Sequence, residues 1–368
     1  MLDPRPVGTA CTLHGSGLLW KLIWNEPAQY KLAMEAKDEL LELIPQLEDE
    51  SGIDVELHSF DTILPIFNDD DQVALDRDVS TSSHDISLQW LDQDGVLACE
   101  PRINREVRRG AVLENSAQVD GYKLSLAFAS GARRKGARFY PLKVVGLERE
   151  GDRVTSVIHT AGRISCDAVV MCMGAWAGAA TAWLDFPVPI YPLLGETIRM
   201  THPDQFPMKV SRPTGGGATP RVDGLLMVGA TGTSRFNDLE GSSMKLELQC
   251  EPTISGYEEM IAPSVHVLPD LARGKIVYHL AGPRPLSADG MPMIGPIPGT
   301  RGAYVATGHR NKGIHLSAFT ARIIRDFVLT GNSVTKNPLD CFKAERFAGQ
   351  ENIQVSALGI TDELRRML

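Results

Sequence analysis

The sequence lacks any long, uninterrupted apolar segment. Its longest uncharged stretch, between Asp167 and Asp185, is broken by Gly174 and Gly178. It falls short of the roughly 18 continuous apolar residues that a membrane-spanning helix needs. No transmembrane helix is therefore expected. Residues 1–6 also lack the charged and then apolar regions of a secretory signal, which favours a cytoplasmic protein.

Cysteine is sparse as well. The 368 residues contain six cysteines, and no two of them form a Cys-x-x-Cys pair. Scattered thiols in a long chain without an export signal are more typical of free cysteines than of a zinc site or disulfides. We therefore predict no metal site, and disulfides remain the less favoured alternative for the even number of thiols.

Basic residues are outnumbered by acidic ones. The chain has 37 Lys and Arg against 46 Asp and Glu, so its formal net charge is −9. A dedicated nucleic-acid binder neutralises many phosphates with Lys and Arg. The charge balance therefore excludes that class of protein.

Apolar runs that end in glycine and lead into a helix occur twice. Residues 167–176 hold a continuous apolar run between Asp167 and Gly174, which is typical of a strand buried on both faces. Residues 302–308 repeat the pattern, and residues 313–329 predict an amphipathic helix. Two such units predict an α/β domain that the chain leaves and re-enters. The length argues for two domains.

Other elements are legible between and before these units. Apolar residues spaced three or four apart over residues 30–44 predict a helix, which Pro45 is expected to end. Residues 121–134 predict a second helix. Strand-like segments joined by turns at 148–152 and 161–162 predict a β-meander over residues 137–166.

Residues 308–314 combine two glycines with four polar residues at the start of the last predicted helix. Free backbone N–H groups and the helix dipole make such a place suitable for an anion. The segment therefore predicts an anion-binding loop. A helix-entry loop that carries solvated side chains is the alternative.

Arg284 lies between two prolines, Pro283 and Pro285, which fix the backbone on both sides. A guanidinium held in this way is suited to a bidentate grip on a carboxylate. The alternative for Arg284 is a structural salt bridge.

Together these segments resemble the FAD-dependent amine oxidoreductases, which include glycine oxidase, D-amino-acid oxidase, sarcosine oxidase and D-amino-acid dehydrogenase. The resemblance extends over nearly the whole chain. The motifs that carry it are Gly282-Pro283-Arg284-Pro285, Asp289-Gly290-Met291-Pro292-Met293-Ile294-Gly295-Pro296, Gly308-His309 with Gly313-Ile314-His315-Leu316, and Asp167-Ala168-Val169-Val170 through Gly174-Ala175-Trp176.

The resemblance implies an enzyme that oxidises the C–N bond of a small amino acid or secondary amine. Arg284 would bind the substrate carboxylate, with Arg310 as a second contact. Hydride would pass from the substrate Cα to flavin N5, giving an imine and then a keto acid. Oxygen or a downstream carrier would take the electrons. Tyr278 and His279 are candidate catalytic residues on the strand leading to Arg284, and alternation lets only one of them face the substrate.

The resemblance also implies where FAD binds and how the chain divides. A discontinuous Rossmann-like FAD domain with the meander would comprise residues 1–45, 118–188 and 281–368. Residues 46–117 and 189–280 would form a substrate domain on an antiparallel sheet. The positions assigned to FAD are Asp3, Thr9, Val144, Gly174, Trp176, Gly308, Arg310, Asn311, Lys312, Gly313 and Ile314.

One motif of the family is missing. Its members begin with a strand, Gly-x-Gly-x-x-Gly and a helix, with an acidic residue about 20 positions later that binds ribose. This sequence contains no Gly-x-Gly-x-x-Gly, and Asp3 stands in the place of the acidic residue. The first strand and helix of the FAD domain are therefore expected to be absent through a misplaced start, a real loss, or supply by another chain. The alternative to an active enzyme is a truncated homologue or partner subunit that does not retain FAD alone, and a homo-oligomer is equally open.

Overall fold

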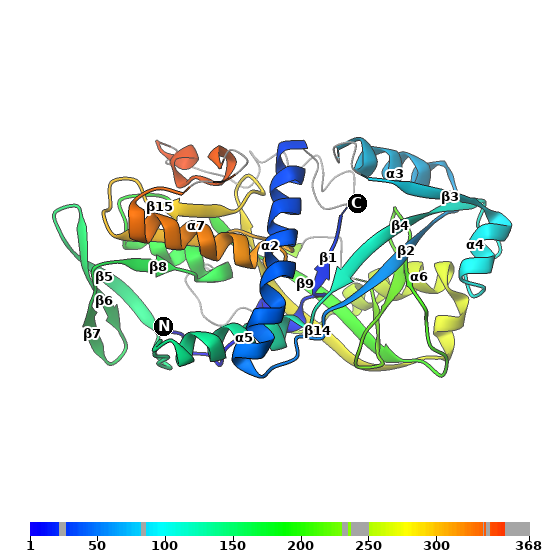
Figure 1. Cartoon of the computed structure of the whole chain (residues 1–368), viewed down its shortest axis with the longest axis horizontal. Coiled ribbons are helices and arrows are strands. Elements are labelled where there is room, and N and C mark those ends of the chain that lie inside the picture. Colours follow the sequence, from blue (N-terminus) through cyan, green and yellow to red (C-terminus); the bar gives the residue numbers. More distant parts are fainter. Residues whose placement is uncertain are drawn as a thin grey trace.

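The computed structural model describes residues 1–21, 27–81, 86–229, 235–236, 250–333, 335 and 339–349. These residues form one large sheet, two three-stranded sheets and the helices that cover them. Figure 1 shows the large sheet at one end of the molecule and the small sheets at the other, with the long helix α2 (Pro27–Ser51) crossing between them. The mixed arrangement confirms the predicted α/β class.

The large sheet carries the longest strand pairing in the described part of the chain. Its strands follow the order β1-β4-β2-β10-β11-β12-β9-β13, with β3 added to β4 and β14 added to β9. All the pairs are antiparallel except β10 with β2. The strands are β1 (Leu18–Leu19), β2 (His58–Ile66), β3 (Leu88–Asp92), β4 (Arg109–Gln118), β9 (Ile190–Thr201), β10 (Lys209–Ser211), β11 (Gly217–Pro220), β12 (Leu226–Val228), β13 (Arg235–Phe236) and β14 (Lys275–Ser287).

The two small sheets lie side by side at the other end (Figure 1). The antiparallel sheet β5-β6-β7 confirms the predicted meander. The other sheet has the order β15-β16-β8, in which β16 and β8 are parallel. The strands are β5 (Val144–Glu150), β6 (Arg153–His159), β7 (Gly162–Ser165), β8 (Val169–Met171), β15 (Met293–Pro296) and β16 (Ala303–Thr307).

The helices include two that the sequence predicted closely. Helix α5 (Gly121–Arg134) has the predicted bounds, and the Asp120 carboxylate caps it by accepting from the Lys123 N–H at 2.8 Å. Helix α7 (Ser317–Thr330) begins four residues later than predicted and ends at Gly331 in the left-handed conformation. Among the described residues we find no helix with the length and apolar character of a membrane span. The other α-helices of the described residues are α1 (Cys11–His14), α3 (Asp69–Thr81), α4 (Gln93–Cys99) and α6 (Ile254–Val267), and the 3₁₀ segments are η1 (Gly174–Ala182), η3 (Pro269–Arg273), η4 (Asp340–Phe342) and η5 (Ala344–Phe347).

The prediction that Pro45 ends its helix is wrong. Helix α2 continues through Pro45 to Ser51. Proline removes one backbone hydrogen bond from a helix interior. The apolar stripe nevertheless goes on past it, because Ile44 and Leu47 are both buried in the core that α2 shares with α5. Packing of this face outweighs the lost hydrogen bond.

The prediction that residues 167–173 form a strand buried on both faces is also wrong. Strand β8 pairs with β16 along one edge, and the described residues place no strand along its other edge. The side chain of Val170 is 37% exposed, and Cys172 is exposed as well. The apolar run alone could not show that a neighbouring strand and a covering helix are needed for full burial.

Candidate active site

Arg284 is placed by the pairing of β14 with β9. It lies opposite Leu193 in the register, and its guanidinium lies across Gly195 of the neighbouring strand. A Cβ at Gly195 would overlap Nε and Cζ of Arg284, so this strand position requires glycine. The arginine is therefore held flat against the sheet by the two strands.

The loop after β16 brings Arg310 to the same place. His309 forms a bridge with Leu286 of β14, and the Arg310 N–H donates to the Pro285 carbonyl at 2.7 Å. Arg310 itself has a positive φ of 50°. Burial lowers the pKa of Arg284, and the nearby positive charge of Arg310 lowers it further. The structure thus brings together the two residues that were predicted to bind carboxylate.

Helix α1 packs against β14 near Arg284. The sequence analysis did not predict this contact. His14 and Cys11 pack against Gly282, and a Cβ there would lie 2.9 Å from His14 Cδ2. Strand β9 fixes this short helix, because the Thr197 hydroxyl donates to the His14 carbonyl at 3.1 Å. Burial raises the pKa of the Cys11 thiol, so the thiol remains protonated beside the arginine.

Tyr278 and His279 point to opposite faces of β14. The register has no shift between residues 278 and 287, so Tyr278 shares the face of Arg284 and is half exposed. His279 lies on the other face and donates from Nε2 to the Glu196 carboxylate at 2.8 Å. Glu196 also accepts from the hydroxyl of Thr253, the residue that caps α6. His279 therefore connects the sheet to α6.

The loops after β8 and β16 meet each other. The Thr307 hydroxyl donates to the Gly174 carbonyl at 2.9 Å, which ties the two glycine turns together. Gly308 has a φ of 78°, a conformation that favours glycine. After it, Asn311 and Gly313 lie in turns, and the chain then reaches the amino end of α7 at Ser317.

The amino-terminal residues contact the segment that follows β8. The Arg5 guanidinium lies 3.8 Å from the ring centroid of Trp176, two residues after Gly174. The Asp3 carboxylate accepts from the Arg5 N–H at 3.0 Å. The Thr9 hydroxyl donates to a carbonyl of the same segment, that of Pro6, at 2.8 Å. Arg5 therefore links Asp3 to Trp176, and Thr9 is fixed within the same amino-terminal segment.

Two other predicted positions contribute differently. Val144 lies at the start of β5, opposite His159 of the meander, and is partly exposed. Ile314 packs its Cδ1 against Gly15 and Gly121, so its side chain belongs to the core and only its backbone can face a ligand.

Buried polar atoms around these loops are consistent with a bound group. Trp176 Nε1 and His14 Nδ1 are buried and find no hydrogen-bond partner among the described residues. Buried polar atoms are normally satisfied, so both have capacity for a ligand. These atoms and the amino end of α7 fit a flavin between the two glycine turns.

Burial keeps the two histidines next to α7 uncharged. It lowers the pKa of His309 to about 4, and His309 Nε2 lies 3.1 Å from the Thr320 hydroxyl. It also lowers the pKa of His315 to about 4, and His315 donates to the Ala33 carbonyl at 2.7 Å. Arg310 and Lys312 therefore provide the positive charge of this loop near neutral pH.

A cluster of three potential metal ligands lies away from this site. His202, Asp204 and Asp270 place one ligand atom each within 4.8 Å of one another. Arg273 Nη1 lies 2.7 Å from Asp204 and 3.1 Å from Asp270, so an arginine already balances both carboxylates. The cluster is best explained as an ion-pair network.

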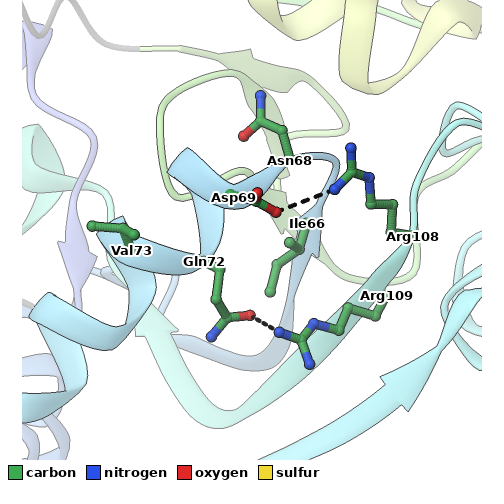
Figure 2. A pocket seen from close by; sticks show the side chains of 7 residues that line it. All are labelled: Ile66, Asn68, Asp69, Gln72, Val73, Arg108 and Arg109. Carbon is green, nitrogen blue, oxygen red and sulfur yellow. Dashed lines mark hydrogen bonds and ion pairs between the residues drawn. The ribbon is translucent and has the colours of Figure 1, made fainter.

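A surface hollow of about 300 Å³ lies between α3 and the start of β4 (Figure 2). Its wall is formed by Arg108, bound to Asp69 at 3.2 Å, and Arg109, bound to Gln72 at 2.7 Å. Both arginines are therefore already hydrogen-bonded to side chains of α3. Figure 1 places α3 at the far end of the large sheet from β8 and α7, so the hollow is separate from the candidate site.

Comparison with known proteins identifies the family of the chain. The family described as FAD dependent oxidoreductase matches residues 1–327. Glycine oxidase of Pseudomonas aeruginosa is 29% identical over 325 residues, which are 87% of this chain and 85% of that protein. Glycine oxidase of Bacillus licheniformis is 28% identical, over 94% of this chain and 90% of that protein.

Solved structures show the same fold. The crystal structure of glycine oxidase from Geobacillus kaustophilus superposes with a TM-score of 0.84 at 24% identity, covering 95% of this chain and 92% of that one. L-proline dehydrogenase from P. horikoshii superposes with a TM-score of 0.75 at 19% identity, covering 90% and 86%. The family model spans most of the sequence. The chain therefore belongs to the family of FAD-dependent oxidoreductases.

Proposed function

We propose that this chain oxidises the C–N bond of a small amino acid or secondary amine such as glycine, a D-amino acid or sarcosine. The observation that carries the proposal is the guanidinium of Arg284, held across Gly195 and next to Arg310. A fixed guanidinium in a partly buried site favours a carboxylate ligand. Similarity to the two glycine oxidases supports the choice of an amine substrate.

The residues of the chain bind and orient the substrate. Arg284 donates two hydrogen bonds to the substrate carboxylate, and Arg310 provides a second contact with it. Tyr278 lies on the same face of β14 as Arg284, six residues earlier. His279 acts as a positioning residue, because it binds Glu196, which also binds the cap of α6. Fixing the carboxylate limits the orientations open to the substrate Cα, which is the main contribution that binding makes to the rate.

FAD, when bound, supplies the electron acceptor for hydride from the substrate Cα, so that the amine becomes an imine and, after hydrolysis, a keto acid. We propose that Asp3, Thr9 and Val144 lie toward its adenosine end. The turns at Gly174 and Gly308, the Trp176 indole N–H, and the backbone of residues 310–314 hold the flavin end. The amino end of α7 favours negative charge there.

The visible spectrum of the full chain tests this function. We expect the protein, purified and incubated with FAD, to show flavin absorbance after removal of free FAD. Anaerobic addition of glycine, sarcosine or D-alanine should bleach that absorbance. A preparation that stays colourless would favour the truncated homologue that does not retain FAD alone. Retained colour that none of these amines bleaches would contradict the substrate class.

Replacing Gly195 tests the placement of Arg284. A Cβ at residue 195 would displace the guanidinium, so Gly195→Ala should weaken glycolate binding about tenfold, or about 1.4 kcal/mol. Calorimetric titration of the FAD-loaded protein measures this. Gly146→Ala is the control, because a Cβ at Gly146 meets only the Ile158 side chain, at 3.5 Å. Equal affinities for both variants would contradict the placement.

A further inference from the structure

His14 is a further group beside Arg284 that the mechanism above does not use. Strands β9 and β14 place Gly195 directly opposite Gly282. Opposed residues of an antiparallel pair direct their Cβ positions to the same face of the sheet, about 4.5 to 5.5 Å apart. The Arg284 guanidinium fills the space over Gly195. The His14 imidazole fills the space over Gly282, where a Cβ would lie 2.9 Å from its Cδ2. The guanidinium and the imidazole are therefore neighbours on one face of the sheet.

Nδ1 of His14 lies on the side of the ring that faces away from β14. The Cδ2 edge of the imidazole lies against Gly282, and Nδ1 is on the opposite edge of the same ring. Nδ1 is buried and has no hydrogen-bond partner among the described residues. A buried polar nitrogen is normally hydrogen-bonded, so this nitrogen is available to a ligand that lies over Gly195 and Gly282.

Strand β9 holds α1 in this position and also affects the charge of His14. The Thr197 hydroxyl binds the His14 carbonyl, and Arg199 Nη2 donates to the Leu13 carbonyl at 3.2 Å. Burial lowers the pKa of His14, and the positive charge of Arg199 lowers it further. The imidazole is therefore uncharged near neutral pH. With its proton on Nε2, it presents Nδ1 as a hydrogen-bond acceptor.

A substrate amine fits this arrangement, because glycine, sarcosine and D-amino acids carry the amine and the carboxylate on one carbon. We infer that His14 Nδ1 accepts a hydrogen bond, and then a proton, from the substrate nitrogen while Arg284 holds the carboxylate. A substrate ammonium must lose a proton before hydride leaves the adjacent Cα, since an ammonium nitrogen has no lone pair with which to form the imine. In that step the substrate N–H bond breaks, the Nδ1–H bond forms, and the electron pair stays on the substrate nitrogen. The inference rests on the proposed function and adds the residue that receives the proton.

Other side chains near Arg284 are less suited to this role. Burial keeps the Cys11 thiol protonated, so it offers only a weak acceptor. His309 Nε2 already lies 3.1 Å from a hydroxyl of α7. His279 lies on the opposite face of β14. His14 combines a place beside the guanidinium with a nitrogen that has no partner among the described residues.

Binding without turnover tests the inference. The full chain is loaded with FAD and reduced anaerobically, so that glycine can bind but cannot be oxidised. Glycine and acetate form a matched pair, because acetate is glycine without its amine. We expect His14→Leu to weaken glycine binding about tenfold in a calorimetric titration, and to leave acetate binding within about twofold of the native value.

Two further variants separate the acceptor from the bulk of the side chain. His14→Asn keeps an oxygen acceptor close to the place of Nδ1 and should retain glycine binding within about threefold of the native value. His266→Leu makes the same change as His14→Leu at an exposed histidine in the last turn of α6. It should bind both ligands as the native chain does.

The pH dependence of flavin bleaching by glycine gives a second readout. The other titratable groups around His14 are Arg199 of β9, Arg284 of β14 and Cys11 of α1, and all three stay protonated between about pH 5 and 7. The anaerobic bleaching rate should fall as the pH drops below about 6.5, because protonation of the imidazole removes the acceptor. His14→Asn should lack this fall.

Three results would overturn the inference. One is an equal loss of glycine and acetate affinity in His14→Leu, which would show that the histidine only shapes the site. Another is native glycine affinity in that variant. The third is the same fall in bleaching rate at low pH in His14→Asn. A native chain that bound neither ligand, or that glycine did not bleach, would contradict the proposed function itself and the inference with it.

Discussion

Arg284→Ala is expected to weaken the binding of carboxylate ligands by about 2 to 4 kcal/mol, on the order of 30- to 1,000-fold. Strand pairing holds the guanidinium against Gly195, beside Arg310. Arg284 is therefore the main charged group that β14 offers to a carboxylate. Alanine removes both donors of a bidentate pair.

Titration of the FAD-loaded protein with glycolate, a carboxylate without an amine, measures this effect without turnover. Arg284→Lys should fall between the native protein and the alanine variant, because lysine keeps the charge but loses the bidentate geometry. Arg163→Ala, at a 70% exposed arginine of β7, is the control and should bind as the native protein does. Native affinity in Arg284→Ala would show that the carboxylate binds elsewhere.

Much of the candidate site could be predicted because its chemistry lies in local motifs. Two prolines around Arg284 indicated a fixed guanidinium, and two glycines around residues 309–312 indicated a turn at a helix start. The structure brings both segments together through the Leu286–His309 bridge. Their convergence followed from family resemblance, and no spacing in the sequence alone could have shown it.

The residues that surround Arg284 were harder to predict, because their positions depend on the register of strands that are distant in the sequence. Helix α1 is four residues long and has no periodic pattern, so nothing local marked His14 or Cys11 as neighbours of β14. Gly195 did carry a usable signal. A glycine inside a long apolar strand indicates the close approach of another group, which here is Arg284.

The fold shows the same division between local and distant causes. The bounds of α5 followed from its own capping and periodicity, and the meander followed from its turns. Helix α2 passed through Pro45 because of packing against α5, and β8 stayed exposed because a neighbouring strand is not present among the described residues. Both errors arose where contacts with other elements decide the outcome.

Asp71→Asn is expected to lower the free energy of unfolding by about 3 to 5 kcal/mol. Asp71 is 0% exposed and lies in the first turn of α3. Its carboxylate accepts from Arg212 Nε at 2.8 Å, from the Thr214 hydroxyl and from the Phe67 N–H at 2.9 Å. Removing its charge leaves the Arg212 guanidinium, which is only 14% exposed, without its counter-ion.

Asp69→Asn, two residues earlier on the same helix, is the matched control. Asp69 pairs with Arg108 (Figure 2). The two side chains are 99% and 63% exposed. Exposed ion pairs contribute about 0 to 1 kcal/mol, so urea unfolding should barely distinguish this variant from the native protein. Equal losses in the two variants would show that the buried pair is not a stabilising contact.

The effect of Asp71 should also depend on pH in one direction. Burial alone would raise the pKa of Asp71, but the hydrogen bonds from Arg212, Thr214 and Phe67 hold it below its ordinary value. A carboxylate with a lowered pKa in the folded state stabilises the protein above its unfolded pKa of about 3.9, and that contribution is lost as the pH falls through the lower, folded value. The gap in unfolding free energy between the native protein and Asp71→Asn should therefore be constant near neutral pH and shrink below about pH 4. If the difference in unfolding free energy stayed the same below pH 4, protonation of Asp71 would have no effect on it. The lower stability of Asp71→Asn would then be due to altered packing around the asparagine and not to the lost charge.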